Sequence, residues 1–350
     1  MKVLEEISLT WLVTGAAGFI GSHLVETLLK NNQRVVGLDN FITGKRSNLD
    51  LVKESVGEKS WGNFSLLEGD IRVLKDCKKS MIWRAALDDD LPSSTVDIVL
   101  HQAALGSVPR SFVEPSESAS INIGGFINVL EAMKEASINN LVYASSSAVY
   151  GDSEQLPKTE GVTGRLLSPY AVTKKANESY ARVYSQAFGL NCVGLRYFNV
   201  FGPRQDPDGA YAAVIPKWFS KLLRDETIEI YGDGETSRDF CYVSNVVEAN
   251  VKAALSSRMK EKAGECGQSK ELNIALGDRA TLNELLEGLK ASIAPHKEIK
   301  SEVRYCDVRT GDVTHSLADI SLARSEIQYD PQVKMTNGIS LLSKYYFQGN

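Results

Sequence analysis

The sequence predicts an α/β fold, with a doubly wound parallel sheet and a smaller C-terminal α/β lobe that would bind the substrate. Two observations support this prediction. Short apolar segments rich in β-branched residues alternate with helical patterns, as in parallel βαβ units. Beyond residue 200, loops rich in Gly, Pro and Asp interrupt shorter elements. We therefore assign residues 1–200 to the main domain and residues 201–350 mainly to the smaller lobe, with some segments returning to the first domain.

The apolar segments justify the sheet one strand at a time. Those at 96–102 and 139–146 are almost continuously apolar, which indicates burial on both faces. Later in the chain, Thr281 and Glu284 have the spacing of a capping box that begins a helix. We interpret residues 83–97 as a local loop insertion and the polar residues 256–270 as a surface loop. The expected strands are 10–13, 34–39, 63–70, 96–102, 139–146 and 191–198.

Composition narrows the class of partner. The 350 residues are 43% hydrophobic and 24% charged, as in ordinary globular proteins, and a net charge of -5 gives no basic surface for nucleic acid. No apolar run approaches the ~18 residues of a membrane span, and the N-terminal residues lack a signal-peptide pattern. The five cysteines have no paired spacing, and reduced thiols fit the cytoplasm. We expect a cytoplasmic protein with a small-molecule partner.

A glycine-rich loop, TGAAGFIG at residues 14–21, directly follows the first expected strand and leads into an amphipathic helix. Gly15 would permit a tight turn, Gly18 would let the backbone approach a pyrophosphate, and Gly21 would permit close packing of helix and sheet. The N-terminus of the helix would face the phosphates. This order of strand, loop and helix predicts a Rossmann-type dinucleotide-binding domain.

An acidic residue indicates which dinucleotide is bound. Asp39 ends the second expected strand, close to the ~20-residue offset of the dinucleotide fingerprint. Its carboxylate would accept hydrogen bonds from both adenosine ribose hydroxyls and would repel a 2′-phosphate, so NAD is favoured over NADP. We interpret the nearby Lys45 and Arg46 as solvated loop residues.

A tyrosine and a lysine share one face of a later helix. Ser168 can cap this helix and Pro169 suits its first position, so Tyr170 and Lys174 stand at i and i+4. Lowering the pKa of a phenol from ~10 to ~7 requires about 4 kcal/mol. One cation ~4 Å away supplies about that much at an effective dielectric of ~20. We expect Lys174, beside a positively charged nicotinamide, to make Tyr170 a phenolate that takes the proton of an alcohol.

Together, TGAAGFIG, SSSAVYG (145–151) and YAVTK (170–174) resemble the extended short-chain dehydrogenase/reductase superfamily, and the resemblance covers nearly the whole chain. AALGSVPRS (103–111) and GDVTHSLADIS (311–321) carry a narrower resemblance to bacterial UDP-N-acetylglucosamine 4-epimerases, the group that prefers N-acetylated hexosamines and acts in surface-polysaccharide synthesis. Further motifs occur in the order seen in nucleotide-sugar members: GDI (69–71), HQAA (101–104), RYFNVFGPRQDP (196–207), GDGETSRDF (232–240) and RTGD (309–312).

The resemblance implies reversible C4 epimerisation of UDP-N-acetylglucosamine to UDP-N-acetylgalactosamine, and of UDP-glucose to UDP-galactose, through a 4-keto sugar with tightly bound NAD. It implies that Tyr170 and Lys174 are catalytic, that Ser146 shuttles the proton and that Ser147 assists. The implied cofactor contacts, beside Tyr170 and Lys174, are Gly15, Ala17, Gly18, Phe19, Ile20, Gly21, Asp39, Asn40, Asp70, Ile71, Gln102, Ala103 and Ala104.

The resemblance also implies a substrate site. Arg238 and Arg309 would bind the diphosphate, because a guanidinium binds two phosphate oxygens at once. Asp312 would bind the uridine ribose, and Ala213 and Val214 the uracil. Tyr231 is a further implied contact. The implied walls around the sugar are Gly106, Ser107, Ser146, Tyr170, Asn199 and Ser316. At the last position some relatives carry a bulky tyrosine, so a serine leaves room for an N-acetyl group.

Several alternatives remain open. Arg110 could meet a carboxylate, which would suit a UDP-glucuronate 4-epimerase or decarboxylase. Another NAD-dependent nucleotide-sugar reductase and a non-catalytic NAD-sensing protein are further alternatives, although the latter should have lost Tyr170 or Lys174. A 4,6-dehydratase is disfavoured because Ala148 stands where those enzymes carry an acid. Ser244 replaces an aspartate common in relatives, with an effect on packing rather than chemistry.

Two further expectations concern assembly and metals. Many relatives dimerise through a four-helix bundle, and the expected helices at 116–136 and 169–189 are the candidates to form it in a homodimer, although their apolar faces could equally cover the sheet. The four histidines have no metal-ligand spacing, so we expect no metal site. His101 ends a buried strand and would pack near NAD.

Overall fold

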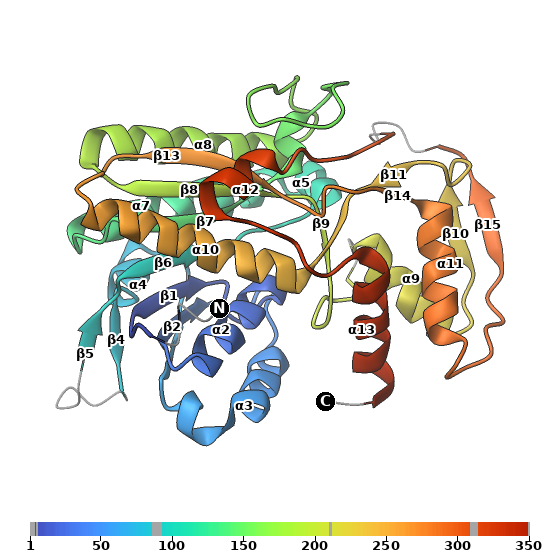
Figure 1. Ribbon diagram of the computed structural model, residues 1–350, viewed down its shortest axis with the longest axis horizontal. Coiled ribbons are helices and arrows are strands. Elements are labelled where there is room, and N and C mark those ends of the chain that lie inside the picture. Colours follow the sequence, from blue (N-terminus) through green and yellow to red (C-terminus); the bar gives the residue numbers. More distant parts are fainter. Residues whose placement is uncertain (1–3, 5, 86–92, 210–211, 309–313, 349–350) are drawn as a thin grey trace.

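A seven-stranded parallel sheet forms the centre of the computed structural model, which describes residues 4, 6–85, 93–209, 212–308 and 314–348 (Figure 1). The strand order is β13-β8-β7-β6-β1-β2-β3. The strands are β1 (Thr10–Thr14), β2 (Arg34–Asp39), β3 (Phe64–Glu68), β6 (Ile98–His101), β7 (Asn140–Ser146), β8 (Asn191–Tyr197) and β13 (Ser269–Ile274). The predicted fold class, a Rossmann-type parallel sheet, is confirmed.

Helices cover both faces of this sheet, because both faces are apolar. Successive residues of β1 point to opposite sides. Trp11 and Val13 pack in one buried cluster with Leu24, whereas Leu12 packs in another with Phe126. The first face carries α2 (Phe19–Lys30) and α10 (Val243–Lys262), with α3 (Arg46–Trp61) against α2. The second carries α4 (Leu74–Lys79), α7 (Phe126–Glu135) and α8 (Pro169–Phe188).

The C-terminal part of the chain builds small elements at one end of the sheet (Figure 1). Its helices are α9 (Val214–Leu223), α11 (Leu282–Ile293) and α13 (Met335–Gln348), whereas α12 (Ser321–Ile327) packs against β13 and α10 of the main domain. Three short strand pairs accompany them: β10 (Ile228–Tyr231) with β15 (Val303–Cys306), β11 (Ser237–Arg238) with β14 (Ala280–Thr281), and β12 (Phe240–Tyr242) with β9 (Asn199–Phe201). β13 and α10 lie beyond residue 200 but belong to the main sheet and its cover. The domain boundary itself stays a prediction.

Local signals explain several boundaries. The capping box is present, with Thr281 Oγ1 accepting from the Glu284 N–H at 3.1 Å and Glu284 Oε2 accepting from the Thr281 N–H at 2.8 Å. The expected loop at 256–270 is partly wrong, because α10 continues to Lys262. Within the expected loop insertion at 83–97, described residues form the strands β4 (Ile82–Arg84) and β5 (Ser93–Thr95), which pair antiparallel.

The expected helix at 116–136 is a composite. It comprises α6 (Pro115–Ala119), a π-helical segment η1 (Ser120–Gly125) and α7, and is preceded by α5 (Val108–Val113). In the described part of the chain, no helix is both long and apolar enough to cross a membrane. The described residues also contain no cluster of His, Cys, Asp and Glu side chains that could hold a metal ion.

Candidate active site

A cavity of about 990 Å³ opens at the carboxyl ends of the parallel strands. Residues at or just beyond the ends of β1, β2, β6, β7 and β8 line it, and Arg238 and Ser316 line it from the C-terminal part. Ligands of open parallel sheets bind at this edge, where the loops of several strands converge. The cavity therefore joins the expected dinucleotide end of the chain to the expected substrate end.

The glycine loop forms the cofactor end of the cavity. Gly15 has a φ of +69°, and a Cβ there would lie 2.9 Å from the backbone nitrogen of Ala103. A Cβ on Gly21 would lie 1.9 Å from the Gly15 carbonyl oxygen, so only glycine lets α2 pack this closely on the loop. Gly18 precedes α2, and no side chain caps this helix. The N–H groups of its first turn can therefore receive an anionic ligand.

Asp39 lies at the same end, at the last position of β2. Its carboxylate accepts hydrogen bonds from the N–H groups of Ala17 (Oδ2, 2.9 Å) and Phe41 (Oδ1, 2.8 Å). Burial raises the pKa of Asp39, and these bonds oppose the shift. A Cβ on Gly44 would lie 2.9 Å from either carboxylate oxygen, so glycine keeps this side of the carboxylate open. These features fit a dinucleotide whose ribose approaches Asp39.

Most of the expected site residues meet in this one cavity. Its lining includes Gly15, Gly18, Phe19, Ile20, Gly21, Asp39, Asn40, Ile71, Gln102, Ala103, Ala104, Gly106, Ser146, Ser147, Tyr170, Lys174, Asn199, Arg238 and Ser316. Ala17 and Asp70 contact residues of the lining. The Ala17 N–H donates to Asp39, and Asp70 Oδ2 accepts from Asn40 Nδ2 at 2.9 Å.

Other expected site residues are not brought to the cavity wall. Ser107 caps α5 by accepting from the Arg110 N–H at 3.2 Å. Ala213 and Val214 begin α9, and Tyr231 ends β10 beside Cys306. Their contacts with substrate stay predictions. Arg309 and Asp312 lie outside the described residues.

The tyrosine, lysine and serine of the expected catalytic group lie together in the cavity. Ser168 caps α8 by accepting from the Ala171 N–H at 3.1 Å, so Tyr170 and Lys174 share one helix face. Lys174 Nζ donates to the Ala144 carbonyl of β7 at 2.8 Å and lies 5.8 Å from the centre of the Tyr170 ring. Ser146, at the end of β7, is near enough to the Tyr170 phenol to favour its ionised form.

The expected phenolate depends on bound NAD, and the chain without cofactor does not produce it. Burial raises the pKa of Tyr170, and the nearby Ser146 hydroxyl only opposes this rise. Burial also lowers the pKa of Lys174 to about 8. The ammonium group is held by the Ala144 carbonyl near the ring and is itself destabilised by burial. The chain alone therefore keeps the phenol protonated at neutral pH.

His101 is a packing residue beside this group, as expected. Its Nδ1 lies 2.9 Å from Thr14 Oγ1, and its ring packs 5.4 Å from that of Phe126. Burial, followed by the nearby charge of Lys174, lowers the pKa of His101 to about 3. The imidazole is therefore neutral and adds no charge next to Lys174.

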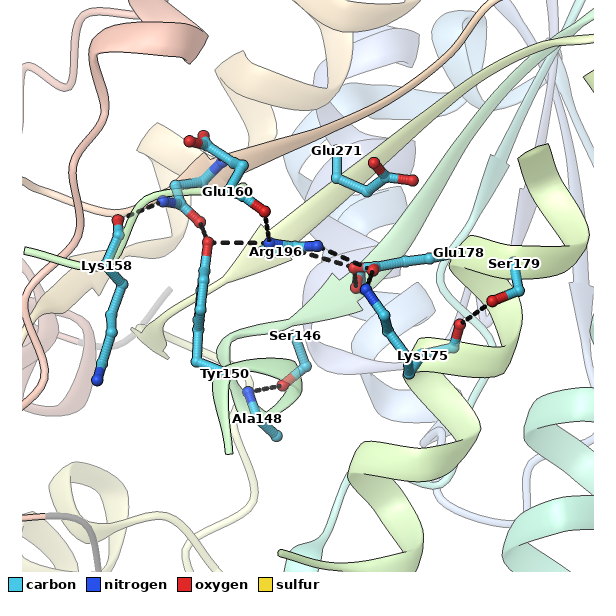
Figure 2. A network of polar contacts seen from close by, with 12 residues as sticks. Ser146, Ala148, Tyr150, Lys158, Glu160, Lys175, Glu178, Ser179, Arg196 and Glu271 are labelled. Atoms are coloured by element: carbon cyan, nitrogen blue, oxygen red, sulfur yellow. Dashed lines mark hydrogen bonds and ion pairs between the residues drawn. The ribbon is translucent and has the colours of Figure 1, made fainter. Parts of the chain in front are cut away.

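A buried ion pair fixes α8 on the sheet (Figure 2). Arg196 of β8 donates to both carboxylate oxygens of Glu178, at 2.8 and 2.9 Å. Its Nη1 also donates to the Tyr150 hydroxyl at 3.1 Å, and Ser145 Oγ donates to Glu178 at 2.8 Å. Burial alone would raise the pKa of Glu178, but Arg196 holds it below its usual value. Glu178 is one turn beyond Lys174, so this pair positions the catalytic face of α8.

Sequence reasoning missed several residues of the cavity. Gly44, beside Asp39, had no motif signal of its own. Phe112 of α5 and Gln205 also line the cavity. Lys158 lies in a segment between motifs, and only the tertiary fold brings it to the cavity wall. Glu178 was readable as a third residue on the face of Tyr170 and Lys174, but its partner Arg196 is on a different element.

Comparison with known proteins identifies the class of protein to which this chain belongs. The chain belongs to the NAD dependent epimerase/dehydratase family, whose model matches residues 11–275, and NAD is its cofactor. The resemblance noted in the sequence is thereby confirmed at the level of the family.

Particular relatives extend along nearly the whole chain. A "Putative UDP-glucose 4-epimerase" of Methanocaldococcus jannaschii is 35% identical over 97% of this chain and 99% of its own length. "UDP-glucuronate 4-epimerase 6" of Arabidopsis thaliana is 34% identical over 97% of this chain and 71% of its own length. The solved UDP-N-acetylglucosamine 4-epimerase from Methanobrevibacter ruminantium, in complex with UDP-N-acetylmuramic acid, superposes with a TM-score of 0.83 at 35% identity, covering 98% of this chain and 99% of that one.

The contacts of Asp39 predict a loss of cofactor retention. Asp39→Asn keeps the shape of the side chain but removes the charged acceptor for ribose hydroxyls, so NAD should bind roughly 10-fold or more weakly. NAD released from purified, denatured protein measures occupancy. Asp50→Asn, on the exposed side of α3, is the matched control and should retain wild-type occupancy. Equal occupancy in both variants would move the ribose contact away from Asp39.

The buried ion pair predicts that two substitutions at Glu178 and its outer partner Lys175 lower the free energy of unfolding by different amounts. Glu178→Gln removes the carboxylate that pairs directly with the buried Arg196 guanidinium, so the free energy of unfolding should fall by about 3–5 kcal/mol. Lys175, which is partly exposed and pairs with the same carboxylate, is the control, because Lys175→Met removes only a peripheral partner worth less than about 1 kcal/mol. Urea unfolding followed by circular dichroism compares the two. Similar small losses would show that the pair does not anchor α8.

Proposed function

We propose that this chain catalyses the reversible C4 epimerisation of UDP-N-acetylglucosamine and UDP-N-acetylgalactosamine, with UDP-glucose and UDP-galactose as further substrates. One observation carries the proposal. Ser146, Tyr170 and Lys174 line the same cavity as the cofactor residue Asp39 and the substrate residues Arg238 and Ser316. Relatives whose names describe UDP-sugar 4-epimerases match nearly the entire chain, which supports the same reaction class.

The proposed chemistry divides between cofactor and chain. When bound, NAD accepts a hydride from C4 of the sugar and later returns it to the opposite face. Tyr170 takes the O4 proton, with the Ser146 hydroxyl as the relay between sugar and phenol. Because burial raises the pKa of Tyr170, the base needs compensating positive charge. Lys174 supplies part of it, and the positively charged nicotinamide supplies the rest, so the base forms only when cofactor is bound.

The substrate end must hold the nucleotide firmly and the sugar loosely, because the keto sugar has to present both faces. We assign the diphosphate to Arg238 and to Arg309, and the uridine ribose to Asp312. Asn199 would hydrogen-bond the sugar. Gly106 and Ser316 are small residues of the cavity lining, and a Cβ on Gly106 would meet no atom within 4 Å. This room supports the acceptance of an N-acetyl group.

UDP-glucuronate is the second candidate substrate, and relatives named for it are among the matches. Arg110, which could have met the carboxylate of UDP-glucuronate, is already paired, since its Nε donates to Glu114 at 2.7 Å. Arg110 is also not among the residues of the cavity lining. A uronate specificity would therefore require a different cation.

We also propose a homodimer through α8 and the helices at 115–135. Val172, Tyr180 and Val183 of α8 are exposed although apolar or aromatic, with Tyr180 39% exposed and Val183 56% exposed. The opposite face of α8 is already buried on the sheet, so these three residues do not serve the monomer's core. A second copy would cover them.

The reaction is tested by incubating purified protein, without added cofactor, with UDP-N-acetylglucosamine and with UDP-glucose. Proton NMR resolves the gluco and galacto epimers. Interconversion, faster with the acetylated sugar, is expected. If neither sugar changes, even with NAD added, the proposed reaction is wrong and UDP-glucuronate becomes the next substrate to test.

Tyr170→Phe should abolish the base while leaving the cavity intact. Turnover should fall by about 10²–10⁴-fold, because proton transfer is lost and positioning survives. NAD occupancy and UDP-sugar affinity should remain near wild type, and both are measured on the same preparation. The matched control is Tyr180→Phe, on the exposed side of α8, which should keep full turnover. Near-normal turnover of Tyr170→Phe would reject this residue as the base.

Ser316→Tyr should narrow the sugar end of the cavity. The ratio of kcat/KM for the acetylated sugar to that for UDP-glucose should fall by roughly 10-fold or more, because the added ring competes with the N-acetyl group for space. Ser316→Ala is the control and should leave the ratio unchanged. Equal losses on both sugars would contradict the placement of Ser316 beside the acetyl group.

A further inference from the structure

Lys158 is a buried cation of the cavity that no part of the mechanism above uses. It lines the cavity and is only 4% exposed. Its backbone is fixed on two sides: the Lys158 N–H donates to the Leu317 carbonyl at 2.8 Å, and its carbonyl accepts from Asn273 Nδ2 at 2.9 Å. Figure 2 shows its side chain extending alongside Tyr150, another residue of the lining. The backbone from which this side chain enters the cavity is therefore held at a defined place.

The polar contacts of this ammonium group are incomplete. A lysine offers three donors, and Lys158 Nζ is hydrogen-bonded to the Ser153 carbonyl. No carboxylate of the described residues lies within 4 Å to form an ion pair with it; Glu154 acts on it only as a more distant charge. Burial lowers the pKa of Lys158. A buried ammonium group without a counter-ion is costly, unless a ligand supplies the opposite charge.

Arg238 is a second cation of the cavity, and the chain at residues 316–317 lies between its segment and that of Lys158. The Ser316 N–H donates to the Ser237 carbonyl at 3.0 Å, beside Arg238, whereas the Leu317 carbonyl accepts from Lys158. The backbone groups of Ser316 and Leu317 therefore bond to chain segments on opposite sides. Arg238 lies in the segment on one side, and Lys158 lies in the segment on the other. Both side chains line the cavity around Ser316. The substrate end therefore presents two cations that approach from different sides.

We propose that Lys158 is a substrate-binding residue that holds an anionic group of the nucleotide sugar, either the diphosphate or a carboxylate on the sugar. The proposal rests on the proposed function, because it assumes that a nucleotide sugar occupies this end of the cavity. It gives Lys158 the role of binding a carboxylate, which the sequence suggested for Arg110. Arg110 is already paired with Glu114. The two sources of negative charge differ in which ligands need Lys158.

Calorimetric titration of the NAD-loaded protein with UDP, UDP-glucose and UDP-glucuronate tests the proposal without relying on turnover. Lys158→Met keeps most of the length of the side chain and removes the charge, and Lys158→Arg restores a cation. Lys59→Met, on the exposed part of α3, controls for the loss of one positive charge. Lys158→Met should weaken binding roughly 10- to 100-fold, Lys158→Arg should recover much of it, and Lys59→Met should bind as wild type does.

The pattern across ligands identifies the bound group. Similar weakening for all three ligands supports contact with the diphosphate, and weakening confined to UDP-glucuronate supports contact with the sugar carboxylate. If wild type binds the ligands and Lys158→Met binds them equally well, the assignment of Lys158 is overturned while the proposed function stands. If wild type binds none of them, the proposed function fails and this assignment fails with it.

Discussion

The ion pair between Arg196 and Glu178 is the interaction on which the geometry of the site depends. Both side chains are almost fully buried, and Glu178 accepts from Arg196 through both oxygens. Tyr170, Lys174 and Glu178 stand at i, i+4 and i+8, so one anchor sets the rotation of the whole face of α8. The same guanidinium reaches Tyr150, beyond the end of β7 that carries Ser146. One pair thus aligns helix and strand around the reacting position.

The buried cations of the cavity are not neutralised by carboxylates of the described residues. Lys174 and Lys158 are both buried and line the cavity, and each has its ammonium group bonded to a backbone carbonyl rather than to a carboxylate. Tyr170 is protonated in the chain alone, because burial raises its pKa. Such a site avoids a free phenolate before the cofactor and a nucleotide sugar are present. In the proposed mechanism, the positive charge of bound NAD favours the Tyr170 phenolate, and an anionic group of the nucleotide sugar offsets the burial of Lys158.

Local patterns in the sequence predicted much of the fold and the cofactor end of the site. The strand at 34–39 was predicted with its observed bounds, because a short apolar segment ends at an acidic residue. The glycine loop and the capping box were readable because each depends on residues a few positions apart. The sequence also placed Ser146, Tyr170 and Lys174 in one cavity, through a resemblance rather than through physical reasoning alone.

Features that depend on residues distant in the chain were not predictable in this way. Arg196 and Glu178 look like ordinary charged positions until the sheet brings them together, and Lys158 reaches the cavity only through backbone pairing with residues 317–319. The seven residues 256–262 continue α10 because the helix packs on the main sheet, although their composition suggested a loop. The raised pKa of Tyr170 likewise follows from burial, which helical spacing does not reveal.

The central claim is that the chain oxidises and re-reduces C4 of a UDP-sugar without releasing the hydride. Its most direct test uses UDP-N-acetylglucosamine carrying deuterium at C4, incubated with purified protein and no added cofactor. NMR and mass spectrometry then follow the label in the galacto epimer. The account predicts an epimer that keeps deuterium at C4. An epimer whose C4 hydrogen comes from solvent would contradict it, because epimerisation would then proceed by proton exchange rather than by hydride return.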